Sequence, residues 1–293
     1  MELLKRNPWT ILWGLLPALI LYILFVIWPI LRSFWYGFFD WNGLSEPVFS
    51  GTDNFVEIFS DPVFWLSLKN NLWVVLASVL LQIPLGLLAA VLLNGRVRGS
   101  KFFRTAFFIP MVLSTVVVGL LWSTMLNSQA GPVNALIMMF GVGLNQTPDW
   151  LGDPNLAIFT LCGVIVWQFV GLYMIIFLAA LQGIPDELLE AASIDGATPF
   201  DQMLRIQLPM VWPTVIASVV LCISGSMRSF DLIFVMTQGG PANATEVMAT
   251  YMYNKTFAVS QYGYGSAVSL VISVISFGLI LVSRAGLSRK EEE

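Results

Sequence analysis

One polar loop between two long apolar segments carries the most specific residue pattern in the sequence. Its specified residues follow the spacing EAA-x3-G-x9-I-x-LP and are Glu190, Ala191, Ala192, Gly196, Ile206, Leu208 and Pro209. Small, apolar and turn-forming residues dominate this set, and no nucleophile in it stands beside a general base. The set is typical of a structured turn between two apolar segments.

The loop is expected to fold as two short amphipathic helices with a tight bend between them. The first should begin near Pro185 and end at Gly196, because glycine readily adopts the positive φ that closes a helix. The second should begin with Thr198 as its N-cap and Pro199 in its first position, and should end before Pro209. Two helices joined in this way form a rigid knob that a groove in another protein can hold and push.

Residue types also exclude several kinds of active site. The sequence contains no histidine, which removes Ser-His and Cys-His catalysis and His-ligated metals. Its two cysteines, Cys162 and Cys222, lie far apart inside apolar segments, where we expect them to pack as small side chains. We therefore predict no catalytic residue, no metal site and no cofactor bound by this chain.

Composition indicates a membrane protein. The chain has 293 residues, of which 57% are hydrophobic and 11% charged, and its mean hydropathy is +0.79. Because a bilayer core about 30 Å thick needs roughly 20 apolar helical residues, six spanning helices are expected. They lie near 10–31, 70–93, 105–126, 156–181, 211–235 and 266–283. The first is too long for a signal-peptide core and is interpreted as a retained span. The expected fold class is thus all-α, a single polytopic transmembrane domain over residues 1–293.

Basic residues predict the orientation of these helices. With the N terminus in the cytoplasm, most of the fourteen Lys and Arg residues fall in cytoplasmic segments, as the positive-inside rule requires. Both termini and the loop 182–210 are then cytoplasmic. The predicted knob would therefore face the cytosol.

The knob resembles, position for position, the coupling loop in membrane subunits of binding-protein-dependent ABC importers. This resemblance implies the type I ABC importer permease fold. It also assigns the seven motif residues, together with Asp195, to coupling with an ATPase.

Other segments resemble the carbohydrate-uptake subfamily of these importers. The matching segments are Phe103–Thr105, Gly131–Asn134, Phe230–Ile233 and Thr237–Asn243. The match is to the maltose-system large-permease type, although the chain lacks the extra N-terminal spans and the large periplasmic insertion of the maltose example. The implied solute is a di- or oligosaccharide, a polyol or a glycerol-phosphate compound.

The resemblance also implies a set of partners. They are a second homologous permease, two ABC ATPase subunits that bind ATP and Mg, and an extracytoplasmic sugar-binding protein. The implied location is the cytoplasmic (inner) membrane of a prokaryote, with the lipid bilayer around the spans and no contact with nucleic acid.

In this family the fourth and fifth spans line the sugar pathway, which implies candidate residues here. They are Trp167, Gln168 and Gly171 on the fourth span and Ser218, Cys222, Gly225 and Ser229 on the fifth. An aromatic face beside an amide suits a sugar, which carries both hydroxyls and apolar ring faces. Since the fifth-span residues form a stripe of small side chains, close helix packing is the alternative interpretation.

Three other functions stay open from the sequence. An importer for a non-sugar solute, such as phosphate or an amino acid, would share the coupling loop. An intramembrane enzyme would need polar catalytic residues within the spans, which are nearly uncharged. An autonomous channel or scaffold would not need a loop built for coupling.

Overall fold

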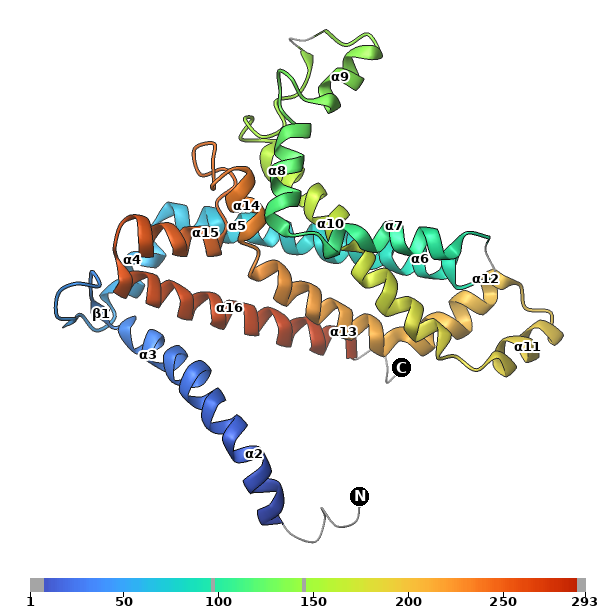
Figure 1. The fold of residues 1–293 in the computed structure, drawn as a ribbon, viewed down its shortest axis with the longest axis horizontal. Coiled ribbons are helices and arrows are strands. Elements are labelled where there is room, and N and C mark those ends of the chain that lie inside the picture. Colours follow the sequence, from blue (N-terminus) through green and yellow to red (C-terminus); the bar gives the residue numbers. More distant parts are fainter. Residues whose placement is uncertain (1–7, 96–97, 144–145, 289–293) are drawn as a thin grey trace. The chain divides into compact units, whose positions relative to one another are not determined.

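A computed structural model shows a mostly helical chain (Figure 1). It describes residues 8–95, 98–143 and 146–288. The chain forms two compact units. The first contains the described residues up to Asp61 together with Met252–Ser273, and the second contains Pro62–Tyr251 and the described residues from Val274 onward.

The first unit includes a short β-hairpin. Its elements, in which η denotes a π-helical turn, are α2 (Pro8–Tyr22), η1 (Ile23–Ile27), α3 (Trp28–Tyr36), β1 (Phe39–Asp40), β2 (Val48–Phe49), α4 (Asp53–Ser60), η5 (Asn254–Ala258) and the first part of α16 (Tyr262–Ser288). The strands are antiparallel, with Phe39 opposite Phe49. Gly263 donates its N–H to the Trp41 carbonyl over 3.0 Å, and a Cβ at this position would overlap the Phe39 oxygen. Glycine at 263 therefore lets α16 pack directly on the hairpin.

The second unit is a helical bundle arranged around α10. Its elements are α5 (Pro62–Ala77), η2 (Ser78–Gln82), α6 (Ile83–Asn94), α7 (Ser100–Val112), α8 (Thr115–Met125), α9 (Pro132–Met139), α10 (Ala157–Gln182), α11 (Asp186–Ile194), α12 (Pro199–Gln202), η4 (Met203–Gln207), α13 (Leu208–Met227), α14 (Asp231–Met236) and α15 (Met248–Tyr253). Helix α10 packs mainly on α6 and α7, and also on α5 and α13.

Buried apolar side chains from several of these helices form the core of the second unit. Leu161 and Ile165 of α10 meet Val74 of α5 and Ile233 of α14 there. Cys162 belongs to the same cluster, and both cysteines are buried free thiols, as predicted.

The helices confirm the expected fold class. Within the described residues, five helical segments are long and apolar enough to cross a membrane, and a sixth is added when a bent pair is counted as one span. The five are Gly14–Tyr36, Pro62–Asn94, Ala157–Gln182, Pro199–Met236 and Tyr262–Gly286.

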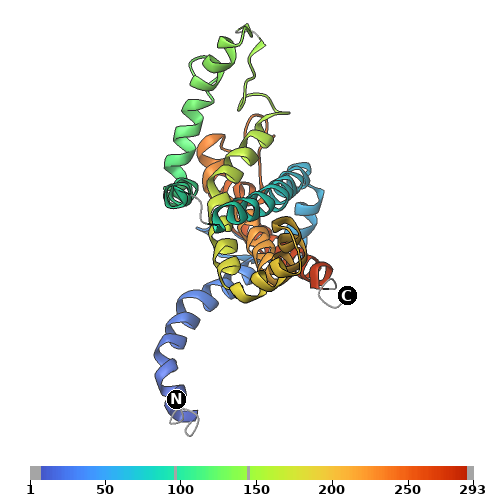
Figure 2. The same ribbon diagram turned by 90° about the vertical axis from the view of Figure 1, so that its right-hand side faces the viewer.

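The bent pair differs from the straight span expected at 105–126. Helices α7 and α8 meet at 98°, so that in Figure 2 α7 is seen end-on while α8 runs upright. The break falls at Leu113, whose backbone is extended, and at Ser114, whose ψ of 130° is also outside the helical range. Pro110 lies in the last turn before the break and cannot donate the backbone hydrogen bond that would hold that turn to the preceding one.

A second difference concerns the knob. Its second helix was expected to end before Pro209, but α12, η4 and α13 form one continuous helix from Pro199 to Met227. In the π-helical turn the Leu208 N–H bonds five residues back, to the Met203 carbonyl. Pro209 then enters within the first turn of α13, where proline is tolerated.

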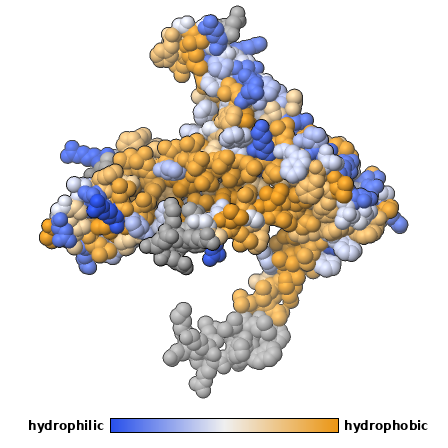
Figure 3. Space-filling model, turned by 180° about the vertical axis from the view of Figure 1, so that it is seen from behind, coloured by the Kyte–Doolittle hydropathy of each residue, from blue (hydrophilic) through white to orange (hydrophobic). Residues whose placement is uncertain are grey.

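Apolar side chains remain exposed over much of the chain. On the face shown in Figure 3 they form a broad area over the helices, while hydrophilic side chains gather toward the ends. Examples are Phe25, Leu80, Leu92 and Leu120, each more than half exposed. Such a surface is unstable in water and indicates contact with lipid or with partner subunits.

Candidate functional site

The first helix of the knob, α11, ends as the sequence predicts. Gly196 has a φ of +85°, the left-handed conformation that favours glycine. Its N–H donates to the Ser193 carbonyl over 3.1 Å, and the Ala197 N–H donates to the Ala192 carbonyl over 2.9 Å. These two bonds form a Schellman motif, which satisfies the last carbonyls of α11 and turns the chain sharply.

The second helix begins with the predicted cap. The Thr198 side chain accepts from the Asp201 N–H, and the Asp201 carboxylate accepts from the Thr198 N–H, so a complete capping box is present. Asp201 lies in the loop, and hydrogen bonds from the Thr198 hydroxyl and N–H hold the pKa of its carboxyl below the usual range. The carboxylate is therefore ionised at physiological pH and keeps the cap intact.

A side-chain bridge joins the two helices of the knob. The Gln202 amide on α12 donates to the Leu189 carbonyl over 3.2 Å and to the Ser193 hydroxyl over 2.8 Å. Both acceptors belong to α11. This bridge fixes the bend between the helices, so the segment is held as a unit.

The knob presents uncovered apolar side chains. Ile194 at the end of α11 is 87% exposed and Phe200 in α12 is 66% exposed. Leu188 in α11, and Leu204 in η4 directly after the knob, are each more than two-fifths exposed. These side chains are therefore available for contact with another protein.

The structure places the predicted coupling residues on this knob and at the base of α13. Glu190, Ala191, Asp195, Gly196 and Pro209 are exposed. The others, Ala192, Ile206 and Leu208, are half-buried. All eight therefore lie within the knob or at its junction with the fifth span.

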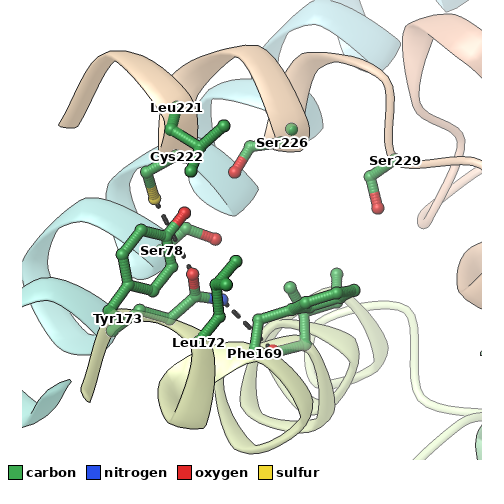
Figure 4. Close-up of a pocket in the computed structure, with 11 residues that line it drawn as sticks. Ser78, Phe169, Leu172, Tyr173, Leu221, Cys222, Ser226 and Ser229 are labelled. Atoms are coloured by element: carbon green, nitrogen blue, oxygen red, sulfur yellow. Dashed lines mark hydrogen bonds between the residues drawn. The ribbon is translucent and has the colours of Figure 1, made fainter. Parts of the chain in front are cut away.

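A cavity of about 160 Å³ lies farther along α13, between that helix, α10 and the α5–α6 segment (Figure 4). Its lining residues are Ser78, Gln82, Ile165, Phe169, Leu172, Tyr173, Leu221, Cys222, Gly225, Ser226 and Ser229. Figure 4 shows hydroxyls and the Cys222 thiol along one part of the wall, with the Phe169 ring in another. Such a wall can hydrogen-bond hydroxyl groups and cover an apolar face at once.

Most of the chain matches a known family. Residues 82–288 match the family described as binding-protein-dependent transport system inner membrane component. The chain belongs to this family. It is thus a multi-pass membrane subunit of a transport system.

Relatives match this permease over nearly its whole length. The probable ABC transporter permease protein YurN of Bacillus subtilis is 36% identical, covering 95% of this chain and 96% of the relative. The multiple sugar-binding transport system permease protein MsmF of Streptococcus mutans is 34% identical, covering 96% of each. A bacterial alginate ABC transporter, solved in complex with an alginate pentasaccharide-bound periplasmic protein, contains a chain with a TM-score of 0.84. That chain is 25% identical, with 99% of the permease and 97% of the solved chain covered.

The fifth-span residues predicted for the pathway divide between two places in the permease. Cys222, Gly225 and Ser229 line the cavity. Ser218 is buried outside that lining, and its hydroxyl has no hydrogen-bond partner among the described residues. Three of the four residues in the stripe therefore face a common space.

The fourth-span residues lie on a neighbouring face of α10. Trp167 packs edge-to-face on Trp122, with ring centroids 5.4 Å apart, and lines a separate apolar groove against α6 and α7. Gln168 is buried and donates to the Thr115 hydroxyl over 3.3 Å. Gly171 lies against the main chain of α7, where a Cβ would overlap the Phe107 oxygen. None of these three residues lines the cavity described above.

Sequence reasoning missed four polar residues of the cavity: Ser78, Gln82, Tyr173 and Ser226. Ser226 follows Cys222 by one helical turn, so the periodicity of the fifth span could have indicated it. Gln82 is an amide inside an apolar segment, which is itself a signal. For Ser78 and Tyr173 the sequence holds no comparable sign.

Proposed function

We propose that this permease is the membrane-spanning subunit of an ATP-driven importer for a sugar. The observation that carries the sugar assignment is the end-to-end match to a multiple-sugar permease, together with a fold likeness to an alginate transporter at a TM-score of 0.84. An amino acid ABC transporter matches less closely, with a TM-score of 0.52 and 16% identity, which supports the shared fold alone.

The knob at Asp186–Gln202 couples the permease to an ATPase subunit in this proposal. The Schellman turn at Gly196, the capping box at Thr198 and the Gln202 bridge together support a segment that moves as a unit. Ile194 and Phe200 would enter a groove of the ATPase, where their apolar surface is removed from water.

Helix α13 carries the movement from the knob to the cavity. Because α12, η4 and α13 are continuous from Pro199 to Met227, displacement of the knob displaces the helix that holds Cys222 and Ser226. At about 1.5 Å per residue this helix is roughly 40 Å long, enough to cross a bilayer core about 30 Å thick. ATP-driven motion would thus alternate the access of the cavity between the two sides of the membrane.

The cavity forms part of the sugar pathway. Its hydroxyl, thiol and amide groups match the hydroxyls of a sugar, and the rings of Phe169 and Tyr173 match the apolar faces. A second homologous permease would complete the pathway. Two ATPase subunits would bind ATP and Mg, and an extracytoplasmic binding protein would deliver the sugar to this assembly in the cytoplasmic membrane.

The test is to isolate the permease from its native membranes in mild detergent and identify the proteins recovered in fixed proportion. We expect an ATPase, a second six-span subunit and, when sugar is present, a sugar-binding protein. Reconstituted vesicles should then accumulate labelled sugar only with ATP. Recovery of the permease alone, or entry of the labelled sugar without nucleotide, would favour an autonomous channel and refute the proposal.

A further inference from the structure

The second span contains a π-helical turn beside the cavity. Helices α5 and α6 are continuous through η2, which runs from Ser78 to Gln82. Both end residues of this turn line the cavity. A π turn contains one residue more than an α-helical turn, so the side chains around it point in different directions from those of a regular α-helix. Such turns are frequent at functional sites.

Gln82 is held in place by two neighbouring helices. Its Nε2 donates to the Ile165 carbonyl of α10 over 3.1 Å, and its Oε1 accepts from the Cys222 thiol of α13 over 3.7 Å. Only 3% of its surface is exposed. The Gln82 side chain therefore fixes the position of η2 against both walls of the cavity.

Ser78 differs from most helical hydroxyls in this chain. Thr105, Thr160, Ser193 and Ser273 each donate to the carbonyl four residues earlier, which satisfies the hydroxyl locally. The Ser78 residue is 1% exposed, and its Oγ makes no hydrogen bond of normal geometry to any described residue; the Cys222 thiol is the one side chain that it weakly approaches. A buried hydroxyl without a partner is costly, so it needs a group that is not part of the helix.

The surroundings of Ser78 indicate what that group is. Figure 4 shows its hydroxyl beside the Tyr173 ring, on the side where Cys222 and Ser226 project from α13. A thiol is only a weak hydrogen-bond acceptor. The cavity wall here is uncharged, so the partner that fits is a neutral hydrogen-bonding group of a ligand, and a sugar hydroxyl is such a group.

We propose that Ser78 hydrogen-bonds one hydroxyl of the transported sugar and that the π turn, fixed by Gln82, aims it there. The inference rests on the proposed sugar import and adds the second span to the residues that select the solute. Ser78 is thus a specificity-determining residue, and Gln82 is a positioning residue.

The test compares Ser78→Ala with the parent permease in vesicles that contain the complete importer. The probe is whichever of maltose, trehalose, lactose and raffinose the parent accumulates fastest, together with the monodeoxy derivatives of that sugar. Loss of one hydrogen bond should slow uptake of the full sugar by roughly fivefold to tenfold. For one monodeoxy derivative, which lacks the matching hydroxyl, the variant and the parent should transport equally fast.

Ser123→Ala is the matched control, because Ser123 also has a buried hydroxyl that bonds to no described residue but does not line the cavity. It should transport every probe as the parent does. Equal uptake by Ser78→Ala and the parent for all probes would overturn the inference, and so would an equal fractional loss for all of them. Failure of the parent to accumulate any of the four sugars would instead count against sugar import itself, and the inference would fall with it.

Discussion

The side-chain amide of Asn71 donates a hydrogen bond to the main-chain oxygen of Ser226 over 3.0 Å. Its Oδ1 accepts from the Met248 N–H, also over 3.0 Å, and the residue is 0% exposed. The Ser226 carbonyl accepts from the Ser229 N–H as well. Asn71 therefore joins α5 to the start of α15 and to the turn in which α13 ends, beside the proposed sugar cavity.

Replacement of Asn71 by alanine should lower the free energy of unfolding by about 1–3 kcal/mol, because the buried Met248 N–H loses its partner. Thermal unfolding of the purified permease in detergent, followed by tryptophan fluorescence, measures the change. Asn155→Ala is the control, since Asn155 is exposed and, among the described residues, its side chain bonds to the nearby Asp153 carboxylate alone. Equal melting temperatures for the two variants would refute a structural role for Asn71.

A charge on the exposed tip of the knob should weaken its contact with the ATPase. Ile194→Asp and Phe200→Asp each place a carboxylate where the proposed interface buries apolar surface. We expect the amount of ATPase recovered with either variant to fall roughly tenfold. Quantitative mass spectrometry of the purified complex measures the recovery.

Leu44→Asp provides the matched control for that prediction. Leu44 is 97% exposed but lies between the two strands of the hairpin, far along the chain from the knob. The Leu44→Asp variant should co-purify with the same amount of ATPase as the parent permease does. If all three variants recover the same amount as the parent, the tip of the knob does not bind the ATPase.

Gly196→Pro should uncouple transport from ATP hydrolysis. Proline fixes φ near −65°, whereas Gly196 requires +85°, and the substitution also removes the N–H that donates to Ser193. Sugar accumulation should be lost, while the binding protein still docks on the opposite side. Uptake by vesicles and capture of the loaded binding protein are the two measurements.

Two alanine variants test whether the loss of coupling depends on the backbone conformation of Gly196. Gly196→Ala should reduce coupling partially, because a left-handed alanine costs about 1 kcal/mol relative to glycine. Gly286→Ala should have no effect, since Gly286 is helical with open space around it. Normal sugar uptake by Gly196→Pro would contradict the coupling role of the knob.

The features of the knob that the sequence predicted correctly all follow from local rules. Gly196 closes a helix and Thr198 caps the next one because each depends on residues within four positions. The prediction at Pro209 was wrong because a π turn precedes this proline and lets the helix continue, and residue types do not reveal where a helix forms a π turn.

The cavity was harder to predict for a different reason. Helix α10 is apolar on every side, so hydrophobic periodicity cannot mark the face that contains Phe169 and Tyr173. Trp167, Gln168 and Gly171 were chosen by residue type, and they lie on the adjoining face. Only the packing of α6 and α7 on α10 decides which face remains open.

Gly171→Ala separates a packing role from a pathway role for one of these residues. Because a Cβ at 171 would overlap the Phe107 oxygen, the substitution must push α7 away from α10 and should destabilise the permease by about 1–3 kcal/mol. Gly163→Ala on the same helix meets no atom within 4 Å and should leave the melting temperature unchanged. If Gly171 instead faced the sugar, its alanine variant would keep the parent's melting temperature and change the relative uptake of different sugars. The close approach of the two helices leads us to expect the loss of stability.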